Sequence, residues 1–196
     1  MIPTITNPSS LSAQWIQEAR DAGLPLPERA ALATVSPNGQ PSVRMVLVKE
    51  TAQDGFVFYT NTKSRKASDL DHNPRAALCF HWPELGKQMR AEGSVEQVSD
   101  AEADAYFASR PRESQLGAWA SVQSAVLETR DMLLRRFNET AREYDGHDVP
   151  RPPHWSGYRL LAEHIEFWQE MPHRLHDRLL YTKRASGFWE AKRLYP

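Results

Sequence analysis

The chain has 196 residues, of which 40% are hydrophobic and 25% are charged, and its formal net charge at pH 7 is −1. These values are ordinary for one globular domain, and they argue against a general nucleic-acid-binding surface. No apolar run approaches the roughly 18 residues of a membrane-spanning helix, and the N-terminus lacks the pattern of a secretory signal, so a cytoplasmic protein that does not cross a membrane is expected.

The first half of the chain is predicted to contain two helices and five strands. Helical spacing of apolar residues predicts a helix at residues 10–22, with Ser10 as its N-cap and Gly23 at its end. Asn38-Gly39 predicts a hairpin turn, because both residues accept positive φ. A short polar helix at 64–73, capped by Ser64, interrupts strands predicted at 31–36, 42–50, 55–60, 75–82 and 87–98.

The single cysteine, Cys79, lies in the apolar run AALCF of the fourth predicted strand. One cysteine cannot form an internal disulfide, which fits a reducing compartment. Since free cysteines in such runs are usually buried, a structural thiol is expected rather than a reactive one.

The second half is predicted to be helical first and strand-rich at its end. Ser99 and Glu102 form a capping box for a helix that ends or bends at Arg110-Pro111, and an amphipathic helix is predicted at 129–144. A proline-rich loop then leads to strand candidates at 157–169, 173–184 and 187–195. Strands at both ends with helices between them favour a single antiparallel barrel with added helices over a parallel βαβ sheet.

Two basic clusters lie in the first half. Arg44 and Lys49 bracket four apolar residues, so they point to opposite faces of a regular strand unless a bulge brings them together. Lys63, Arg65 and Lys66 lie where a strand turns into a helix, whose N-terminal N–H groups would help to bind a phosphate. Solvated surface cations would give the same patterns, so both interpretations stay open.

A third group consists of Tyr106, Arg110 and Ser114. Tyr106 and Arg110 are four residues apart and would share a helix face, and Arg110 at the helix end can offer its guanidinium group to a second phosphate. An ordinary surface contact between tyrosine and arginine has the same spacing.

The most specific group is near the C-terminus. In HRLHDR, Arg174, His176 and Arg178 alternate with other residues, so a strand here presents all three toward water or a binding site. Asp177 could be a general base, although a salt-bridged acid is commoner. His173 and His176 fall on opposite faces, and no other spacing resembles a metal site, so no metal is expected. Together the groups indicate planar, phosphorylated ligands and an organic cofactor.

These segments, in this order, resemble the pyridoxamine 5′-phosphate oxidase family. The likeness runs from about Ala30 to Pro196, and its most specific stretches are RMVLVK, FYTNTKSRKASDL, YFASRPRESQLGAWAS, Gln123-Ser124 and IEFWQ…RLHDR. The resemblance implies a mainly β fold, an FMN-binding split β-barrel of the antiparallel, Greek-key type with flanking helices. A helical arm at 1–24 and a single domain at 25–196 are expected, in a homodimer that binds FMN at the subunit interface.

The resemblance also implies roles for individual residues. The implied FMN contacts, some of them from the partner chain, are Arg44, Met45, Val46, Leu47, Val48, Lys49, Tyr59, Thr60, Arg65, Lys66, Gln88, Gln123, Ser124, Trp168 and Arg178. The implied substrate contacts are Lys49, Tyr106, Arg110 and Ser114 at the phosphate, and Arg174, Leu175 and His176 at the pyridine ring. Arg174 and His176 are the implied catalytic residues.

The implied reaction is oxidation of pyridoxamine or pyridoxine 5′-phosphate by O₂ to pyridoxal 5′-phosphate. A hydride equivalent leaves C4′ of the substrate for FMN, H₂O₂ is released, and the amine substrate also yields ammonia through an imine. This sequence departs from the family twice. Leu26 precedes Pro27 where many relatives carry an acid, with Glu28 the nearest acid, and the N-terminal arm is short, so a lid built from it is expected to be reduced or missing.

Two other functions remain as alternatives. A flavin oxidase of phenazine biosynthesis would act on another aromatic substrate, and the complete set of phosphate and ring residues argues against it. A non-catalytic split-barrel protein that stores or senses flavin or haem would bind its cofactor without turnover, and it would not need Arg174 and His176.

Overall fold

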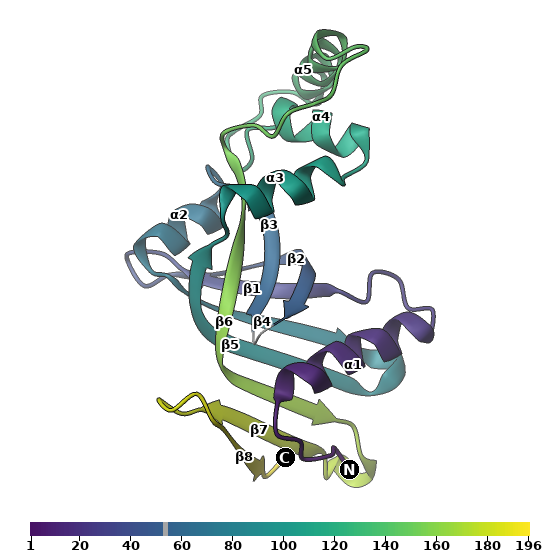
Figure 1. Cartoon of the computed structure of the whole chain (residues 1–196), viewed down its shortest axis with the longest axis vertical. Coiled ribbons are helices and arrows are strands. Elements are labelled where there is room, and N and C mark those ends of the chain that lie inside the picture. Colours follow the sequence, from purple (N-terminus) through teal and green to yellow (C-terminus); the bar gives the residue numbers. More distant parts are fainter. Residues whose placement is uncertain (53–54) are drawn as a thin grey trace.

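The computed structural model describes residues 1–52 and 55–196, and its strands form one antiparallel sheet (Figure 1). The strands are β1 Arg29–Val35, β2 Pro41–Ala52, β3 Gly55–Asn61, β4 Arg75–Trp82, β5 Lys87–Gln97, β6 Trp155–Gln169, β7 Asp177–Lys183 and β8 Trp189–Leu194. Their order is β3-β2-β1-β4-β5-β6-β7-β8, and a further pairing of β3 with β6 closes the first six strands into a barrel. Because β4 lies beside β1 after the β1–β2–β3 meander, the arrangement is a Greek key, as predicted.

The helices lie outside the barrel (Figure 1). They are α1 Pro8–Asp21, α2 Arg65–His72, α3 Asp100–Ala108, α4 Arg112–Ala120 and α5 Arg130–Glu143. Helix α4 was not predicted as a separate element. None of the described helices is long and apolar enough to span a bilayer.

Three local predictions about turns and caps need correction. The N-cap of α1 is Asn7, whose side chain accepts from the N–H of Ser9 at 2.9 Å, so Ser10 lies inside the helix. Ser64 is the N-cap of α2, but its side chain makes no capping hydrogen bond. At the β1–β2 hairpin only Gly39, with φ 83°, has positive φ. The predicted capping box at the start of α3 is confirmed.

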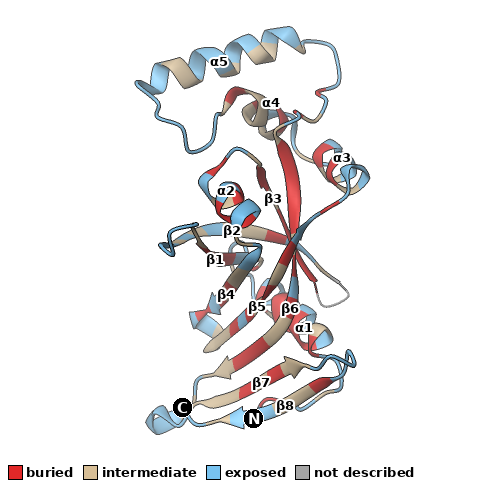
Figure 2. Cartoon of the chain, turned by 90° about the vertical axis from the view of Figure 1, so that its left-hand side faces the viewer, coloured by how far each residue is buried: buried red, intermediate tan, exposed pale blue. Residues whose placement is uncertain are grey.

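The main core fills the barrel and continues under α1. Buried residues lie along the barrel strands (Figure 2), and four of them are phenylalanines from β3, β4 and β6. The ring of Trp15 on α1 packs edge-on against Phe167 at 5.0 Å. The ladder between β5 and β6 is interrupted next to Gly93, where a Cβ atom would lie 1.9 Å from the carbonyl oxygen of Leu161. Only glycine allows the two strands to approach this closely.

Cys79 is less buried than predicted. Its side chain is half-buried on β4, and desolvation raises the pKa of the thiol. The thiolate is therefore scarce at neutral pH, which agrees with a structural role.

The single chain is elongated and exposes a large surface. Its accessible area is 11244 Å², compared with about 9,400 Å² for a compact monomer of this size. Large apolar side chains remain uncovered, among them Val126 between α4 and α5 at 97% and Leu175 before β7 at 69% exposure. Such surface is typical of a chain that pairs with another.

Both termini lie at the end of the molecule formed by β7 and β8 (Figure 1). Ile2 is buried there: its N–H donates to Asp177 at 2.6 Å, and its carbonyl oxygen accepts from Arg193 at 2.8 Å. The N–H of Ile5 donates to the hydroxyl of Tyr181. Hydrogen bonds thus attach the first residues of the chain to β7 and β8.

Candidate active site

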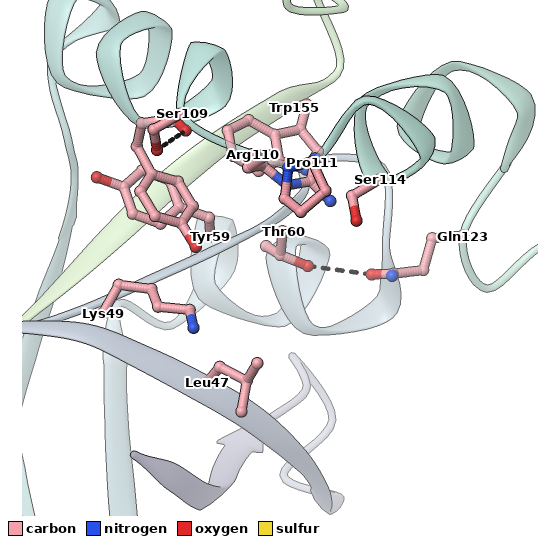
Figure 3. A pocket seen from close by; sticks show the side chains of 11 residues that line it. Leu47, Lys49, Tyr59, Thr60, Ser109, Arg110, Pro111, Ser114, Gln123 and Trp155 are labelled. Atoms are coloured by element: carbon pink, nitrogen blue, oxygen red, sulfur yellow. Dashed lines mark hydrogen bonds between the residues drawn. The ribbon is translucent and has the colours of Figure 1, made fainter. Parts of the chain in front are cut away.

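A cavity of about 480 Å³ lies between the barrel and the α3–α4 region (Figure 3). It is lined by all four residues predicted to bind the substrate phosphate and by four further residues predicted to contact FMN. The first set is Lys49, Tyr106, Arg110 and Ser114, and the second adds Leu47, Tyr59, Thr60 and Gln123. Ser109, Pro111 and Trp155 also line it and were not predicted.

Arg110 lies in the link between α3 and α4, because α3 ends at Ala108. Contrary to the prediction, it therefore does not share a helix face with Tyr106, although both residues line the cavity. Its guanidinium carbon lies 4.8 Å from the ring centre of Trp155, and its buried Nη1 atom has no hydrogen-bond partner. Desolvation lowers the pKa of Arg110. A half-buried cation without a partner at a cavity wall favours an anionic ligand.

The N-terminus of α4 adds to this positive end of the cavity. Its N-cap, Pro111, provides no side-chain cap, and Ser114 lies in the first turn. Since the first N–H groups of a helix lack partners within it, they and the Ser114 hydroxyl can donate to the same anion.

Lys49 lies on the opposite wall of the cavity, on β2 (Figure 3). It is the extra residue of a β-bulge between Val48 and Glu50. Its ammonium group pairs with Glu28 at 3.0 Å. Desolvation alone would raise the pKa of Glu28, but hydrogen bonds from its backbone and from Lys49 hold the pKa below its usual value. The acid nearest to Leu26 in the sequence thus pairs with a residue that lines the cavity.

A second basic cluster surrounds the N-terminus of α2. The Nζ atom of Lys66 donates to Thr60 at 3.0 Å, Ser64 at 3.2 Å and Gln123 at 2.7 Å, all of them neutral acceptors. Desolvation, and then the charge of Arg44, lower the pKa of Lys66 to about 8. The first turn of α2 contains no acid. This cluster can therefore bind a second phosphate.

Arg44 and Lys49 have different partners. Arg44 donates to Thr34 and Ser42 and lies 3.7 Å from Asp69, between β1 and α2. Of the apolar residues between the two cations, Leu47 lines the cavity, Met45 is exposed, Val46 is half-buried and Val48 is buried in the core.

The loop after α4 closes the second cluster. The hydroxyl of Ser124 accepts from the backbone N–H of Arg65 at 3.2 Å, and the Arg65 side chain is exposed. Ser124 has φ 72°, a left-handed conformation that is uncommon for serine and often found at functional sites.

The remaining predicted FMN contacts lie at the β7–β8 end. Gln88, Trp168 and Arg178 occupy neighbouring register positions on β5, β6 and β7. Arg178 donates to Glu166 at 2.7 Å, and this hydrogen bond raises the pKa of Arg178. The His176 ring lies 4.6 Å from that of Trp168.

The segment before β7 is not a strand, contrary to the prediction. Pro172–Arg174 form a 3₁₀ turn and β7 begins at Asp177, so Arg174, His176 and Arg178 do not alternate on one strand. Arg174 has φ 61° and an exposed side chain without a partner among the described residues. A left-handed conformation of this kind is uncommon for arginine, and such residues cluster at functional sites.

Hydrogen bonds define the chemical state of two residues in this segment. The Met171 N–H donates to Nδ1 of His176 at 3.3 Å, so the neutral imidazole carries its proton on Nε2 and can donate from there. Asp177 pairs with Arg193 and accepts from Ile2, which agrees with a salt-bridged acid rather than a general base.

The predicted site residues therefore form two groups, one near each end of β6. Trp155 in the cavity and Trp168 at the other group are near the two ends of β6. At about 3.3 Å per residue they lie roughly 40 Å apart along the strand. One chain does not bring Arg110 and Arg174 together.

Two family models match most of the chain. Residues 16–142 match the family model described as pyridoxamine 5′-phosphate oxidase, and residues 155–196 match the pyridoxine 5′-phosphate oxidase C-terminal dimerisation region. The second match supports a homodimer. A group of three or more His, Cys, Asp and Glu residues arranged to hold a metal is absent from the described part of the chain.

Relatives of known name cover nearly the whole chain. Pyridoxine/pyridoxamine 5′-phosphate oxidase of Rhodospirillum rubrum is 53% identical over 97% of this chain and 96% of its own length. The Burkholderia mallei protein of that name is 54% identical over 93% of this chain and 86% of its own length.

Among solved structures, PhzG from Burkholderia lata, in complex with tetrahydrophenazine-1-carboxylic acid, has a TM-score of 0.94 and 30% identity, covering 100% of this chain and 98% of PhzG. An FMN-binding protein from Nostoc punctiforme, 18% identical with a TM-score of 0.78 over 99% of this chain and 100% of its own, shares the fold. The split-barrel fold predicted from the sequence is thereby confirmed. By its sequence and its fold, the chain belongs to the pyridoxamine 5′-phosphate oxidase family.

Proposed function

We propose that this protein is a cytoplasmic, homodimeric, FMN-dependent oxidase that converts pyridoxamine and pyridoxine 5′-phosphates into pyridoxal 5′-phosphate with O₂. The observation that carries the proposal is the cavity in which Lys49, Tyr106, Arg110 and Ser114 meet. The unpaired Nη1 atom of Arg110 supports an anionic substrate there.

The residues around α2 fit the phosphate of FMN. Lys66 and the N-terminus of α2 offer positive charge without a neutralising acid in the first turn. Gln123 accepts through its amide oxygen, which leaves its NH₂ group free to donate. We therefore assign FMN binding to this cluster, with Tyr59 and the β2 backbone beside it. When bound, FMN would accept two electrons from the substrate and pass them to O₂.

A second copy of the chain would complete the site. Its Arg174 and His176 would bind the pyridine ring, and its Gln88, Trp168 and Arg178 would contact FMN. The exposed Arg174 and Leu175, the separation of the two groups along β6 and the match to a dimerisation region support this arrangement. Arg174 would bring a positive charge to the ring, and Nε2 of His176 would donate a hydrogen bond, so these groups position the substrate for oxidation.

An oxidase of the phenazine type is a second candidate, because the PhzG structure superimposes on this chain with a TM-score of 0.94. That function would not need a site for a phosphate dianion. Arg110, Lys49 and Ser114 around one cavity favour the phosphorylated substrate.

The test is aerobic turnover of the FMN-loaded protein with pyridoxamine 5′-phosphate, with product absorbance and peroxide followed together. Equal formation of both supports the proposal. The matched controls are pyridoxamine without its phosphate and a tetrahydrophenazine carboxylic acid. Bound FMN with turnover of the second control alone would contradict the proposed substrate, and bound FMN without any turnover would favour a flavin-binding role.

A further inference from the structure

Arg110 is held by aromatic rings rather than by an acid. Its guanidinium carbon lies 4.8 Å from the ring centre of Trp155 and 5.4 Å from that of Phe107. Among the described residues it forms no ion pair, and its Nη1 atom is buried without a hydrogen-bond partner. A carboxylate would fix the guanidinium group but would also neutralise it. A ring face attracts the cation and leaves its N–H groups free to donate.

The Trp155 ring is fixed on its other sides. It is 6% exposed, Phe107 packs edge-on against it at 5.0 Å, and Tyr59 stacks on it at 5.4 Å with 7° between the planes. The backbone carbonyl oxygen of Trp155 accepts a hydrogen bond from Arg151 at 2.7 Å, and Arg151 is paired with Asp100 of α3. The ring therefore has little freedom to move away from Arg110.

The stack continues to a second predicted phosphate ligand. Tyr59 lies on Tyr106 at 3.9 Å with 13° between the rings. Tyr59 in turn lies against Gly157, where a Cβ atom would come within 2.7 Å of its ring. Trp155 and Gly157 are two positions apart on β6 and therefore lie on the same face of the strand. The stacked rings of Trp155, Tyr59 and Tyr106 are thus supported by this one face of β6.

We propose that Trp155 is a positioning residue that orients Arg110 toward the substrate phosphate and so sets the preference for phosphorylated substrates. This inference rests on the proposed function. The role is distinct from the phosphate contacts themselves, because the indole acts only through Arg110. It explains how a cation stays charged, oriented and unpaired in a half-buried wall of the cavity.

The test compares Trp155→Leu with Trp119→Leu. Trp119 belongs to the same small apolar cluster, bonds to the carbonyl oxygen of Pro150 and packs against Tyr144, but it does not line the cavity. Trp155→Leu should raise KM for pyridoxamine 5′-phosphate about tenfold, equivalent to ~1.4 kcal/mol, with kcat changed less than about threefold. Trp155→Phe should recover part of the loss, and Trp119→Leu should leave KM unchanged.

Calorimetric titration of the FMN-loaded proteins with inorganic phosphate is the second readout. Weaker phosphate binding by Trp155→Leu, with FMN retained, supports the assignment. An unchanged KM and phosphate affinity, or equal effects of Trp155→Leu and Trp119→Leu, would overturn it. If Trp155→Leu does not fold, Trp155→Phe carries the same comparison. If the phosphate affinity of the protein depends on Trp155 but the wild type turns over no B6 phosphate, the proposed function is refuted and this inference stands.

Discussion

Two inactive variants of this protein should restore activity to each other in mixed dimers. Arg110→Ala damages the cavity group and Arg174→Ala damages the group beside β7, which lies roughly 40 Å away along β6. If each site combines one group from each chain, a mixed dimer contains one site with both substitutions and one with neither. The second site should have wild-type activity.

The expected recovery follows from the two-fold symmetry. Random association of equal amounts makes about half of the dimers mixed, and one of their two sites is intact, so about a quarter of wild-type activity should return. The variants are mixed in urea, refolded with FMN and assayed for pyridoxal 5′-phosphate. Wild type and each variant alone go through the same cycle as controls. A mixture no more active than the separate variants would refute the shared site.

Three single substitutions test further predictions. Arg174→Ala should retain FMN, seen as flavin absorbance after gel filtration, but lower kcat/KM at least about a hundredfold, because a positioned charged contact is lost; near-normal turnover would remove Arg174 from the mechanism. The pKa of Lys66 is about 8, below its ordinary 10.5, so its charge is present below pH 8 and lost above it. FMN affinity, titrated by flavin fluorescence, should therefore fall as the pH rises from about 7 to about 9, and Lys66→Met should flatten this dependence; a constant wild-type affinity would contradict the assignment. Trp15→Ala should lower the free energy of unfolding in urea by about 3–5 kcal/mol, since this side chain is buried against Phe167; a loss below about 1 kcal/mol would contradict its place in the core.

The strands were predictable because alternating apolar residues and turn residues are local signals. β4, for instance, covers the predicted residues 75–82. Helix α4 was missed because Pro111 reads as a helix end, whereas here it is also the N-cap of the next helix. The alternation in HRLHDR predicts a strand, but Pro172 and the left-handed backbone at His173 and Arg174 make a turn there.

The candidate site was less predictable because its parts come from distant segments. Tyr59, Tyr106 and Trp155 form one stack although they belong to β3, α3 and β6. In the sequence, Trp155 is recognisable only as a tryptophan at the end of a proline-rich loop that leads into a strand. This position does not show which residues will contact it. The separation of Arg110 from Arg174 likewise depends on the length and direction of β6.

Residues near both ends of the chain form hydrogen bonds with Asp177 and Arg178, which follow directly after the segment that carries Arg174 and His176. The N–H of Ile2 donates to Asp177, and the carbonyl oxygen of Tyr195 accepts from Arg178 at 3.0 Å. A purification tag fused at either end would begin beside this segment, and trimming a few residues by a protease would remove its supports. For this protein, tagging and truncation are therefore perturbations of the proposed ring-binding group, and kinetic comparisons require chains with identical ends.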